Sequence, residues 1–444
     1  MRTVIKNATV VTMNDARDIL REATVCTEDG RIVDIFSTCS PGRALQRDGE
    51  PNDHNVEENV IDAQGDVLLP GLINAHTHLA MSLFRNYGND VALKEWLEDY
   101  IWPLEAHLTR EEIVAGAKLS ILEMLRGGTT TFADMYMEED AIAEAVTQMG
   151  IRALLCPAFT DGSVATRPEE VRRLAAYQTA NGRIRMRLAP HAVYTCSPET
   201  LQKVKALGEK WGIGFHLHLA ETREEDEQCR KTYGISPTML LDRANLLGPN
   251  TMLAHAIWLD DDDIACIAAR GASCVYNPVS NMKLASGFMP LEKLRKAGVS
   301  IALGTDGPSS NNAQDMFREM LVGSLIQKGH SLDPTAANAH TMLWMATRGG
   351  ARAIGQEKEL GSIEIGKKAD LILVDFRHVR HTPKPEDIEA ALVYATSSDD
   401  VRLTMIDGII RMQDGRFPGQ NEEAICQEAE RAWRTLHKQK GQRA

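Results

Sequence analysis

The stretch LLPGLINAHTHL, residues 68–79, is the part of the sequence that decides the fold. It is an apolar run that predicts a strand, and it ends in the pair His76 and His78. A segment with helical periodicity follows at 110–126. Side chains two apart in a strand point to the same face, so both imidazoles can converge on one ion. The sequence therefore predicts a strand-then-helix unit with metal-ligand spacing at the strand end.

Seven further units of this kind follow along the chain. Their predicted strands are GTTTFADM (128–135), IRALLCPAF (151–159), IRMRLAPHAVY (184–194), GIGFHLHLAE (212–221), TMLAHAIWL (251–259), SCVYNPV (273–279) and SIALGTDG (300–307). Their predicted helices are 138–149, 168–179, 198–211, 224–233, 260–270, 291–297 and 313–327. Eight strand-then-helix units in about 260 residues are typical of an α/β fold of the (β/α)8 TIM barrel type.

The two ends of the chain differ from this alternation. The first 60 residues contain Val/Ile/Thr-rich strands with an Asp29-Gly30 turn, and strands return after residue 360 with further Asp-Gly turns. We therefore expect a small β-sandwich-like second domain that both chain ends build together. The predicted division is 1–60 and 361–419 for this domain, 61–360 for the barrel and 420–444 for a terminal helix.

The polar stretch 40–59 is rich in Pro, Gly and Asp and predicts an exposed loop, and a metal role for its His54 is disfavoured. With 62 acidic against 49 basic residues the net charge is −13, which disfavours nucleic acid and anionic lipid as partners. The eight cysteines form no CxxC pair, which argues against a zinc ribbon or a disulfide framework. No signal-peptide pattern or membrane-spanning apolar run occurs, so we expect a cytoplasmic protein.

Three more predicted strands end in residues that can bind a metal ion. FHLHLAE offers His216 and His218 on one face, and spacing alone does not choose between them. His255 and Asp306 follow two later strands, and each has an alternative interpretation as a buried core histidine or a turn-forming aspartate. Because the C-terminal ends of barrel strands meet at one rim, the coincidence favours a common site.

These residues and their surroundings resemble the amidohydrolase superfamily over nearly the whole chain. The segments that carry the resemblance are DAQGDVLLPGLINAHTHL, EWLEDYIWPLEAHL, RGGTTTFADMY, PHAVYTCS, HLAET, LGTDGPSSNN and GSIEIGKKADLILVDF. They are most similar to the branch of 5'-methylthioadenosine/S-adenosylhomocysteine deaminases. Triazine hydrolases and other aromatic-base deaminases share several of these segments.

The resemblance implies a metal site made of His76, His78, His218 and Asp306. It favours His218 because the family's proton-carrying glutamate lies three residues past the ligand, where this chain has Glu221. His216 then has a supporting role. The family's binuclear members carry a bridging lysine where this chain has Pro190-His191, so we expect one ion per chain. Zinc is the default for such ligands, and iron or manganese also suits them.

The implied chemistry is hydrolytic deamination. Three imidazoles and a carboxylate leave a coordination position for water, whose pKa the ion lowers toward about 7. Glu221 is expected to carry the water proton to a ring nitrogen, while His255 and Asp306 orient the hydroxide. The adduct then expels ammonia.

The resemblance also implies substrate contacts. Glu105 and His191 are expected at the ribose hydroxyls, Trp96 over the base or the 5' thioether, and Arg167 at a homocysteine carboxylate. The family uses two arginines for that carboxylate, but Pro157 stands where we place the first. Methylthioadenosine is therefore the expected substrate, ahead of S-adenosylhomocysteine.

Two alternatives accompany this hypothesis. A triazine or guanine deaminase or hydrolase would use the same scaffold without ligands for a ribose diol. A catalytically silent assembly protein is a further alternative, but it has no need for the complete set of metal ligands and Glu221. A homo-oligomer is compatible with either kind of protein.

Overall fold

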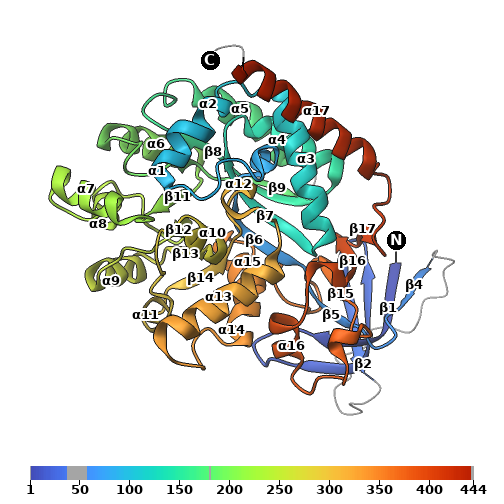
Figure 1. Ribbon diagram of the computed structural model, residues 1–444. Coiled ribbons are helices and arrows are strands. Elements are labelled where there is room, and N and C mark those ends of the chain that lie inside the picture. The colour runs from blue at the N-terminus through green and yellow to red at the C-terminus, as the bar shows by residue number, and fades with distance from the viewer. Residues whose placement is uncertain (1, 38–57, 180–181, 442–444) are drawn as a thin grey trace.

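The computed structural model describes residues 2–37, 58–179 and 182–441. Its centre is a barrel of parallel strands (Figure 1). The barrel strands are β6 (Leu72–Thr77), β7 (Thr129–Tyr136), β8 (Arg152–Phe159), β9 (Ile184–Met186) with β10 (Ala189–Pro190), β11 (Phe215–Leu219), β12 (Thr251–His255), β13 (Ser273–Tyr276) and β14 (Ser300–Leu303).

The barrel strands form two parallel sheets, one of β6 to β10 and one of β11 to β14, and two contacts join these sheets into a closed ring. On one side a parallel bridge joins Leu188 to Phe215, and on the other the Asp306 amide donates to the carbonyl of His76 at 2.9 Å. Closure places the C-terminal ends of all the strands at one rim. The predicted α/β barrel is confirmed.

Helices follow the strands as the periodicity predicts. They are α3 (Arg110–Arg126), α4 (Glu139–Met149), α5 (Arg167–Ala175), α6 (Pro198–Trp211), α7 (Arg223–Tyr233), α9 (Asp261–Arg270), α11 (Leu291–Lys296) and α13 (Met316–Ser331). Helix α6 illustrates the local signals: the Ser197 hydroxyl accepts from the Thr200 amide, Pro198 starts the helix, and Gly212 ends it at φ 64°.

Several short elements lie between the strands and these helices, and the sequence analysis did not predict them, apart from residues 176–179, which fall within the helix predicted at 168–179. They are η1 (Leu79–Phe84), α1 (Leu93–Glu95), η2 (Trp96–Ile101), α2 (Trp102–Glu105), η3 (Ala176–Thr179), α8 (Pro237–Arg243), α10 (Pro278–Lys283) and α12 (Pro308–Asn311). After α13 come α14 (Ala339–Trp344), η4 (Met345–Gly349) and α15 (Gly350–Ala353). Most of them span one or two turns, too few for a periodic apolar pattern to identify.

Both chain ends build the second domain, as predicted. Figure 1 places the blue strands β1 and β5 beside the orange and red β15 and β16. The sheet has the order β17-β16-β15-β5-β1-β2-β3, with β4 also paired to β1. Its strands are β1 (Arg2–Val11), β2 (Ile19–Glu28), β3 (Arg31–Ser37), β4 (Glu58–Asp62), β5 (Val67–Pro70), β15 (Leu371–Val374), β16 (Val401–Ile406) and β17 (Ile409–Gln413).

The side chains of β15 show how this sheet joins the barrel. Leu371 and Leu373 belong to the small domain's own core, whereas Ile372 and Val374 belong to the core that includes the barrel helices. Because alternate residues of a strand point to opposite faces, both faces are buried and the strand is apolar throughout.

Two Asp-Gly turns meet at the edge of this domain. Asp29 and Gly30 have φ of 48° and 81°, and Asp407 and Gly408 have 49° and 73°, as a type I′ hairpin turn requires. A Cβ on Gly30 would lie 3.0 Å from the Asp407 carbonyl oxygen, so glycine also permits the close approach.

We propose one change to the predicted domain bounds. Strand β5 lies after residue 60 but pairs in the small sheet, so we propose that the first boundary runs through Gly71. The last helix, α17 (Glu422–Gly441), packs on α3, and α16 (Ile388–Tyr394) lies between β15 and β16 in the chain. His54 and most of the predicted 40–59 loop lie outside the described residues.

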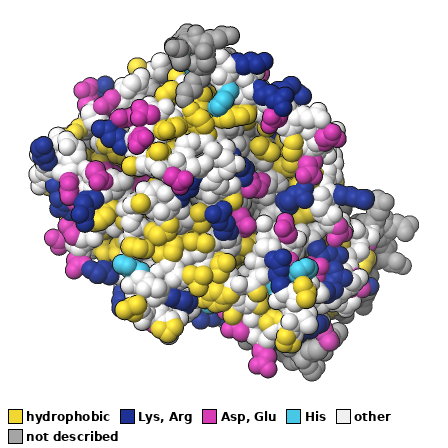
Figure 2. Space-filling model, in the orientation of Figure 1, with side chains coloured by type: hydrophobic (Ala, Val, Ile, Leu, Met, Phe, Trp, Pro, Cys, Tyr) yellow, Lys and Arg dark blue, Asp and Glu magenta, His cyan; other side chains and the backbone are white. Residues whose placement is uncertain are grey.

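Acidic and basic side chains are interspersed over the face drawn in Figure 2. None of the seven cysteines in the described part of the chain forms a disulfide. Among the helices of the described residues, none has the length and apolarity needed to cross a membrane.

Candidate active site

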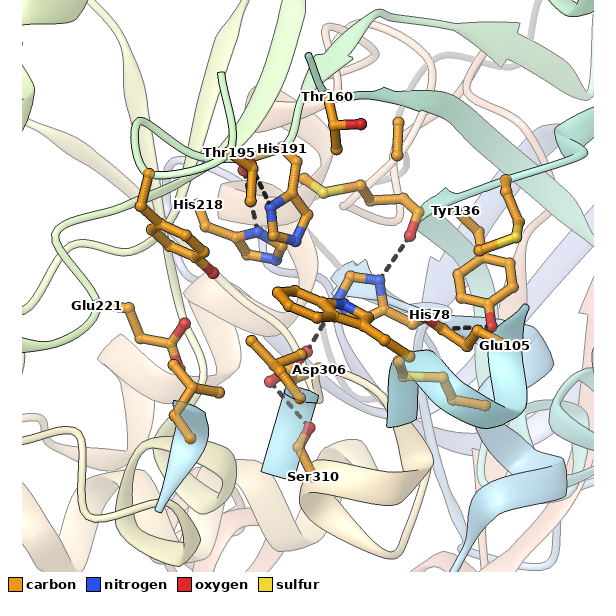
Figure 3. A pocket seen from close by; sticks show the side chains of 18 of the residues that line it. His78, Glu105, Tyr136, Thr160, His191, Thr195, His218, Glu221, Asp306 and Ser310 are labelled. Atoms are coloured by element: carbon orange, nitrogen blue, oxygen red, sulfur yellow. Dashed lines mark hydrogen bonds and ion pairs between the residues drawn. The ribbon is translucent and has the colours of Figure 1, made fainter. Parts of the chain in front are cut away.

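A cavity of about 470 Å³ opens at the C-terminal rim of the barrel. In Figure 3 Glu221 lies on one side of it and Glu105 with Tyr136 on the other, with His78, His218 and Asp306 between them. This is where a TIM barrel places its active site, because the strand ends and the loops after them face one another there.

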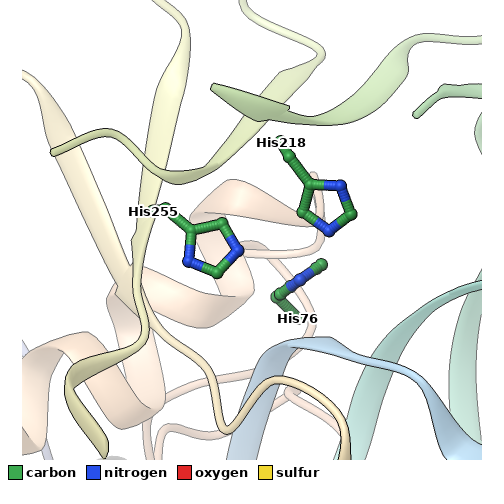
Figure 4. A group of neighbouring side chains, drawn as sticks. All are labelled: His76, His218 and His255. Carbon is green, nitrogen blue, oxygen red and sulfur yellow. The ribbon is translucent and has the colours of Figure 1, made fainter. Parts of the chain in front are cut away.

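The predicted metal ligands converge in this cavity. Asp306 Oδ1 lies 3.5 Å from His76 Nε2 and 3.2 Å from His78 Nε2. The ligand atoms of His76, His218 and His255 also lie within 4.8 Å of one another, as Figure 4 illustrates. Strands β6, β11 and β12 and the turn after β14 therefore bring together side chains that lie far apart in the sequence.

Each of these imidazoles is held from behind through its Nδ1 atom. The partners are Met135 O for His78 at 2.5 Å, His191 O for His218 at 3.1 Å, Asn281 Oδ1 for His255 at 2.9 Å, and His216 Nε2 for His76 at 3.1 Å. A carbonyl oxygen can only accept, so His78 and His218 carry their proton on Nδ1. Nε2 is then the nitrogen that each ring presents to a metal ion, as in metal-binding histidines.

The structure separates the positions of His216 and His218, which spacing alone could not distinguish. The Nε2 atom of His216 is in contact with the Nδ1 atom of His76, so this nitrogen of His216 is already occupied. The His218 ring faces the cavity instead. The two side chains share one face of β11, but only His218 reaches the rim.

The electrostatics of these groups suit a divalent cation. Burial lowers the pKa of His76 to about 3, so its imidazole is neutral, and its Nε2 atom is buried without a hydrogen-bond partner. Burial also lowers the pKa of His78, but the hydrogen bond and charge of Asp306 outweigh it and raise that pKa to about 9. Burial raises the pKa of Asp306, yet His76 and His78 bring it well below its usual value. The residues present thus fit a metal ion.

Glu221 lies beside this cluster, with Oε2 3.6 Å from His255 Nε2. Burial raises the pKa of Glu221. A raised carboxyl pKa favours both accepting and releasing a proton near neutral pH. The positive φ values of His255 (69°) and Asp306 (62°) show that the backbone is constrained at both strand ends.

The predicted substrate residues all line the same cavity. Glu105 Oε1 accepts from the Tyr136 hydroxyl at 2.6 Å, and burial raises its pKa. His191 Nδ1 lies 2.9 Å from the Thr195 hydroxyl, and burial lowers the pKa of this imidazole to about 4. Trp96 Nε1 is buried without a protein partner.

Arg167 is less available than the sequence suggested. Its Nε donates to Ala158 O at 2.9 Å, and its Nη1 donates to Glu170 Oε2 at 2.5 Å. Two of its three nitrogens are therefore occupied within the protein. Pro157 is buried in β8 and is not among the residues lining the cavity.

Several supporting residues were missed by the sequence analysis. The hydroxyls of Ser280 and Ser310 donate to Asp306 Oδ2 at 2.5 and 2.9 Å, and Asn281 and Tyr136 hold His255 and Glu105. Serine and asparagine after a strand resemble ordinary turn residues. The Asn277-Pro278 dipeptide is a turn signal that could have indicated this loop, but the sequence analysis included it in the predicted strand 273–279.

Comparison with known proteins identifies the family. The model of the amidohydrolase family matches residues 67–411. The chain belongs to the amidohydrolase family. Among its amidohydrolase relatives, a 5'-deoxyadenosine deaminase of Methanosarcina barkeri is 41% identical, covering 97% of both chains. A 5-methylthioadenosine/S-adenosylhomocysteine deaminase of Moorella thermoacetica is 46% identical and covers 83% of this chain and 87% of that protein.

Solved amidohydrolase structures have the same architecture. An adenosine deaminase of Xanthomonas campestris with bound zinc superposes with a TM-score of 0.91 at 33% identity, over 98% of both chains. A triazine hydrolase variant gives 0.87 at 23% identity, over 97% of this chain and 99% of that one, which shows a common fold alone. The family generally uses a divalent metal ion, and the recognition of this superfamily from the sequence is confirmed.

Proposed function

We propose that this amidohydrolase is a hydrolytic deaminase of 5'-substituted adenosines that converts 5'-methylthioadenosine to its inosine analogue and ammonia. The observation that carries the proposal is one cavity with two chemically different sides. Glu221 lies on one side of the cavity and Glu105 on the other, with the metal-ligand residues His78, His218 and Asp306 between them. Relatives 41% and 46% identical are named as deaminases of 5'-deoxyadenosine and of 5-methylthioadenosine/S-adenosylhomocysteine.

The metal site of the proposal consists of His76, His78, His218 and Asp306, with zinc as the ion and one ion per chain. Three neutral imidazole nitrogens and a carboxylate are typical zinc ligands, and iron or manganese also binds such sets. When bound, the ion supplies a Lewis acid that makes the attacking water more acidic.

The protein's own groups carry the protons. Glu221 Oε2 accepts a proton from the attacking water and delivers it to the purine ring nitrogen next to the amino-bearing carbon. His255 Nε2, 3.6 Å from that oxygen, and Asp306 orient the water toward the ring. Because all three groups are buried, they are largely shielded from bulk water and their interactions are stronger than at the surface.

Glu105 and His191, which both line the cavity, suit the ribose. A carboxylate and an imidazole together accept and donate hydrogen bonds, which is what a vicinal diol requires. Glu105 is held by Tyr136 and His191 by Thr195, so both are oriented before substrate binds. Trp96 is proposed to cover the base or the 5' substituent, because its ring lines the cavity.

The proposal predicts a preference at the 5' position. Methylthioadenosine should have a kcat/KM at least equal to that of S-adenosylhomocysteine, because Arg167 is already paired with Glu170 and Pro157 replaces a second arginine. One charge-assisted hydrogen bond contributes about 1.5–3 kcal/mol, or roughly ten- to more than a hundredfold. Steady-state kinetics with both nucleosides measures the difference.

Two variants distinguish the contacts to the ribose from the contacts to the homocysteine carboxylate. Glu105→Ala should lower kcat/KM for both nucleosides alike, whereas Arg167→Ala should affect only S-adenosylhomocysteine. A clear preference for S-adenosylhomocysteine would contradict the inference that the protein lacks a full set of partners for the homocysteine carboxylate. Unchanged kcat/KM after removal of the ribose hydroxyls would contradict the nucleoside assignment.

One screen tests the function as a whole. Ammonia release should occur with methylthioadenosine or 5'-deoxyadenosine, and not preferentially with guanine or melamine. The alternative of a triazine or guanine deaminase rests on structures that are 20–24% identical to this chain. These structures share only its fold. A silent assembly protein would release ammonia from none of these compounds. We also propose a cytoplasmic location and a homo-oligomeric assembly for this protein.

A further inference from the structure

We propose that Ser286 is the positioning residue of Glu221, and that the segment Pro278–Ser286 orients the groups that carry protons. This inference rests on the proposed deaminase function, because it concerns how Glu221 transfers a proton. The segment comprises α10 and the turn after it, and it follows β13, a barrel strand for which the sequence analysis named no site residue. No residue of it was predicted to act at the site.

Three contacts connect this segment to the three proton-handling side chains. Ser280 donates to Asp306 Oδ2 at 2.5 Å, and Asn281 Oδ1 accepts from His255 Nδ1 at 2.9 Å. Ser286 donates from Oγ to Glu221 Oε1 at 3.3 Å. One short piece of chain therefore sets the relative orientation of groups from three other strands.

The contact from Ser286 determines which oxygen of Glu221 is free. Because Oε1 accepts the serine hydroxyl, Oε2 is the oxygen next to His255 Nε2, at 3.6 Å. A carboxylate that must collect a proton from water and return it elsewhere needs one oxygen held and one exposed to the reactants. Loss of the hydroxyl would let the carboxyl group rotate and lose this alignment.

The serine itself is held rigidly. Its amide donates to Asn281 O at 2.9 Å, and its carbonyl accepts from Trp258 Nε1 at 2.8 Å. The next residue, Gly287, has φ 128°, and a Cβ there would lie 2.9 Å from Ile257. The turn thus lies tightly against the chain that follows β12.

These contacts close a ring around Glu221. The Arg223 guanidinium lies 4.7 Å from the centroid of the Trp258 ring, and Arg223 is two residues from Glu221. On the backbone side, Glu225 accepts from the Glu221 amide at 2.8 Å. The backbone of Glu221 is therefore held by its own loop, and its side chain is held by Ser286.

The test compares Ser286→Ala with the wild-type enzyme loaded with metal. We expect kcat to fall about tenfold, the loss of one hydrogen bond to a charged group, while KM, metal content and the dissociation constant for the inosine-type product hardly change. Ser286→Thr, which keeps the hydroxyl, should restore most of kcat. Ser286→Cys keeps the volume with a weaker donor and should lie between Ala and Thr.

A matched control separates positioning from stability. Ser236 is also buried and also donates to a buried carboxylate, that of Asp263, but outside the cavity. Ser236→Ala should lower the melting temperature and leave kcat unchanged. Equal kcat losses in the Ser236 and Ser286 variants would contradict a specific role for Ser286.

A double variant gives the decisive result. In the Glu221→Gln background, Ser286→Ala should cause little further loss, because residues that act as a unit are not additive. The same tenfold loss in that background, or an unchanged kcat in Ser286→Ala alone, overturns the inference and leaves the deaminase function standing. A wild-type protein that releases ammonia from no nucleoside contradicts the proposed function first.

Discussion

Replacing Glu221 with glutamine should lower kcat at least about 100-fold, the scale of general acid-base catalysis. Glutamine preserves the shape of the side chain and can still accept from Ser286, but it cannot carry a proton from water to the purine ring. Metal content should hardly change, because Glu221 is not among the proposed ligands. Steady-state kinetics and elemental analysis of the same preparation provide the two measurements.

Glu224 offers a matched control three residues along the chain. It is exposed and does not line the cavity, so Glu224→Gln should keep full activity. Asp226 also lies outside the cavity lining and is paired with Arg230. Near-normal turnover of Glu221→Gln would mean that another residue carries the proton, and Glu224 and Asp226 would then be the first to substitute.

His78→Ala should lose the metal ion and, with it, essentially all activity. Wild-type protein should contain about one divalent ion per chain, because the sequence and the described residues supply one imidazole-rich site. His78 places its Nε2 atom 3.2 Å from Asp306 Oδ1, closer than His76 Nε2 at 3.5 Å. Elemental analysis after extensive dialysis measures the loss.

His216→Ala is the control for His78→Ala, because both remove an imidazole that lies next to the proposed metal site. His216 contacts His76 from behind, so we expect its loss to weaken metal affinity by roughly 10- to 100-fold, as for other outer partners of metal ligands. The site should still fill at saturating zinc. Exchanged outcomes for the two variants would contradict the assignment of His218 as a ligand, as would two ions per chain.

Most of the fold could be predicted from the sequence because its signals are local. The barrel strands are short apolar runs, most of them followed by a helix of two or more turns, and α6 begins and ends at the serine and glycine that cap it. The Asp-Gly turns of the small domain have the positive φ values that their residue types suggest. Short elements such as α10 could not be predicted, since one or two turns carry no periodic pattern.

The proposed metal-ligand set could be predicted from the sequence because its residues stand at strand ends that a barrel brings to one rim. The choice between His216 and His218 was not accessible from the spacing, because both side chains point to the same side of β11. The depth of each residue in the barrel makes the difference. His216 contacts the Nδ1 atom of His76, whereas His218 lines the cavity.

The sequence by itself determined the class of fold, the family and the residues able to bind an ion, because periodicity and motif spacing are properties of neighbouring residues. Tertiary structure alone decided which atoms face one another: the pairing of Arg167 with Glu170, the anchoring of each imidazole through Nδ1, and the contact of Ser286 with Glu221. Serine and glutamate here lie 65 positions apart. Ordinary turn residues acquire such a role only when closure of the barrel brings distant loops within hydrogen-bond distance.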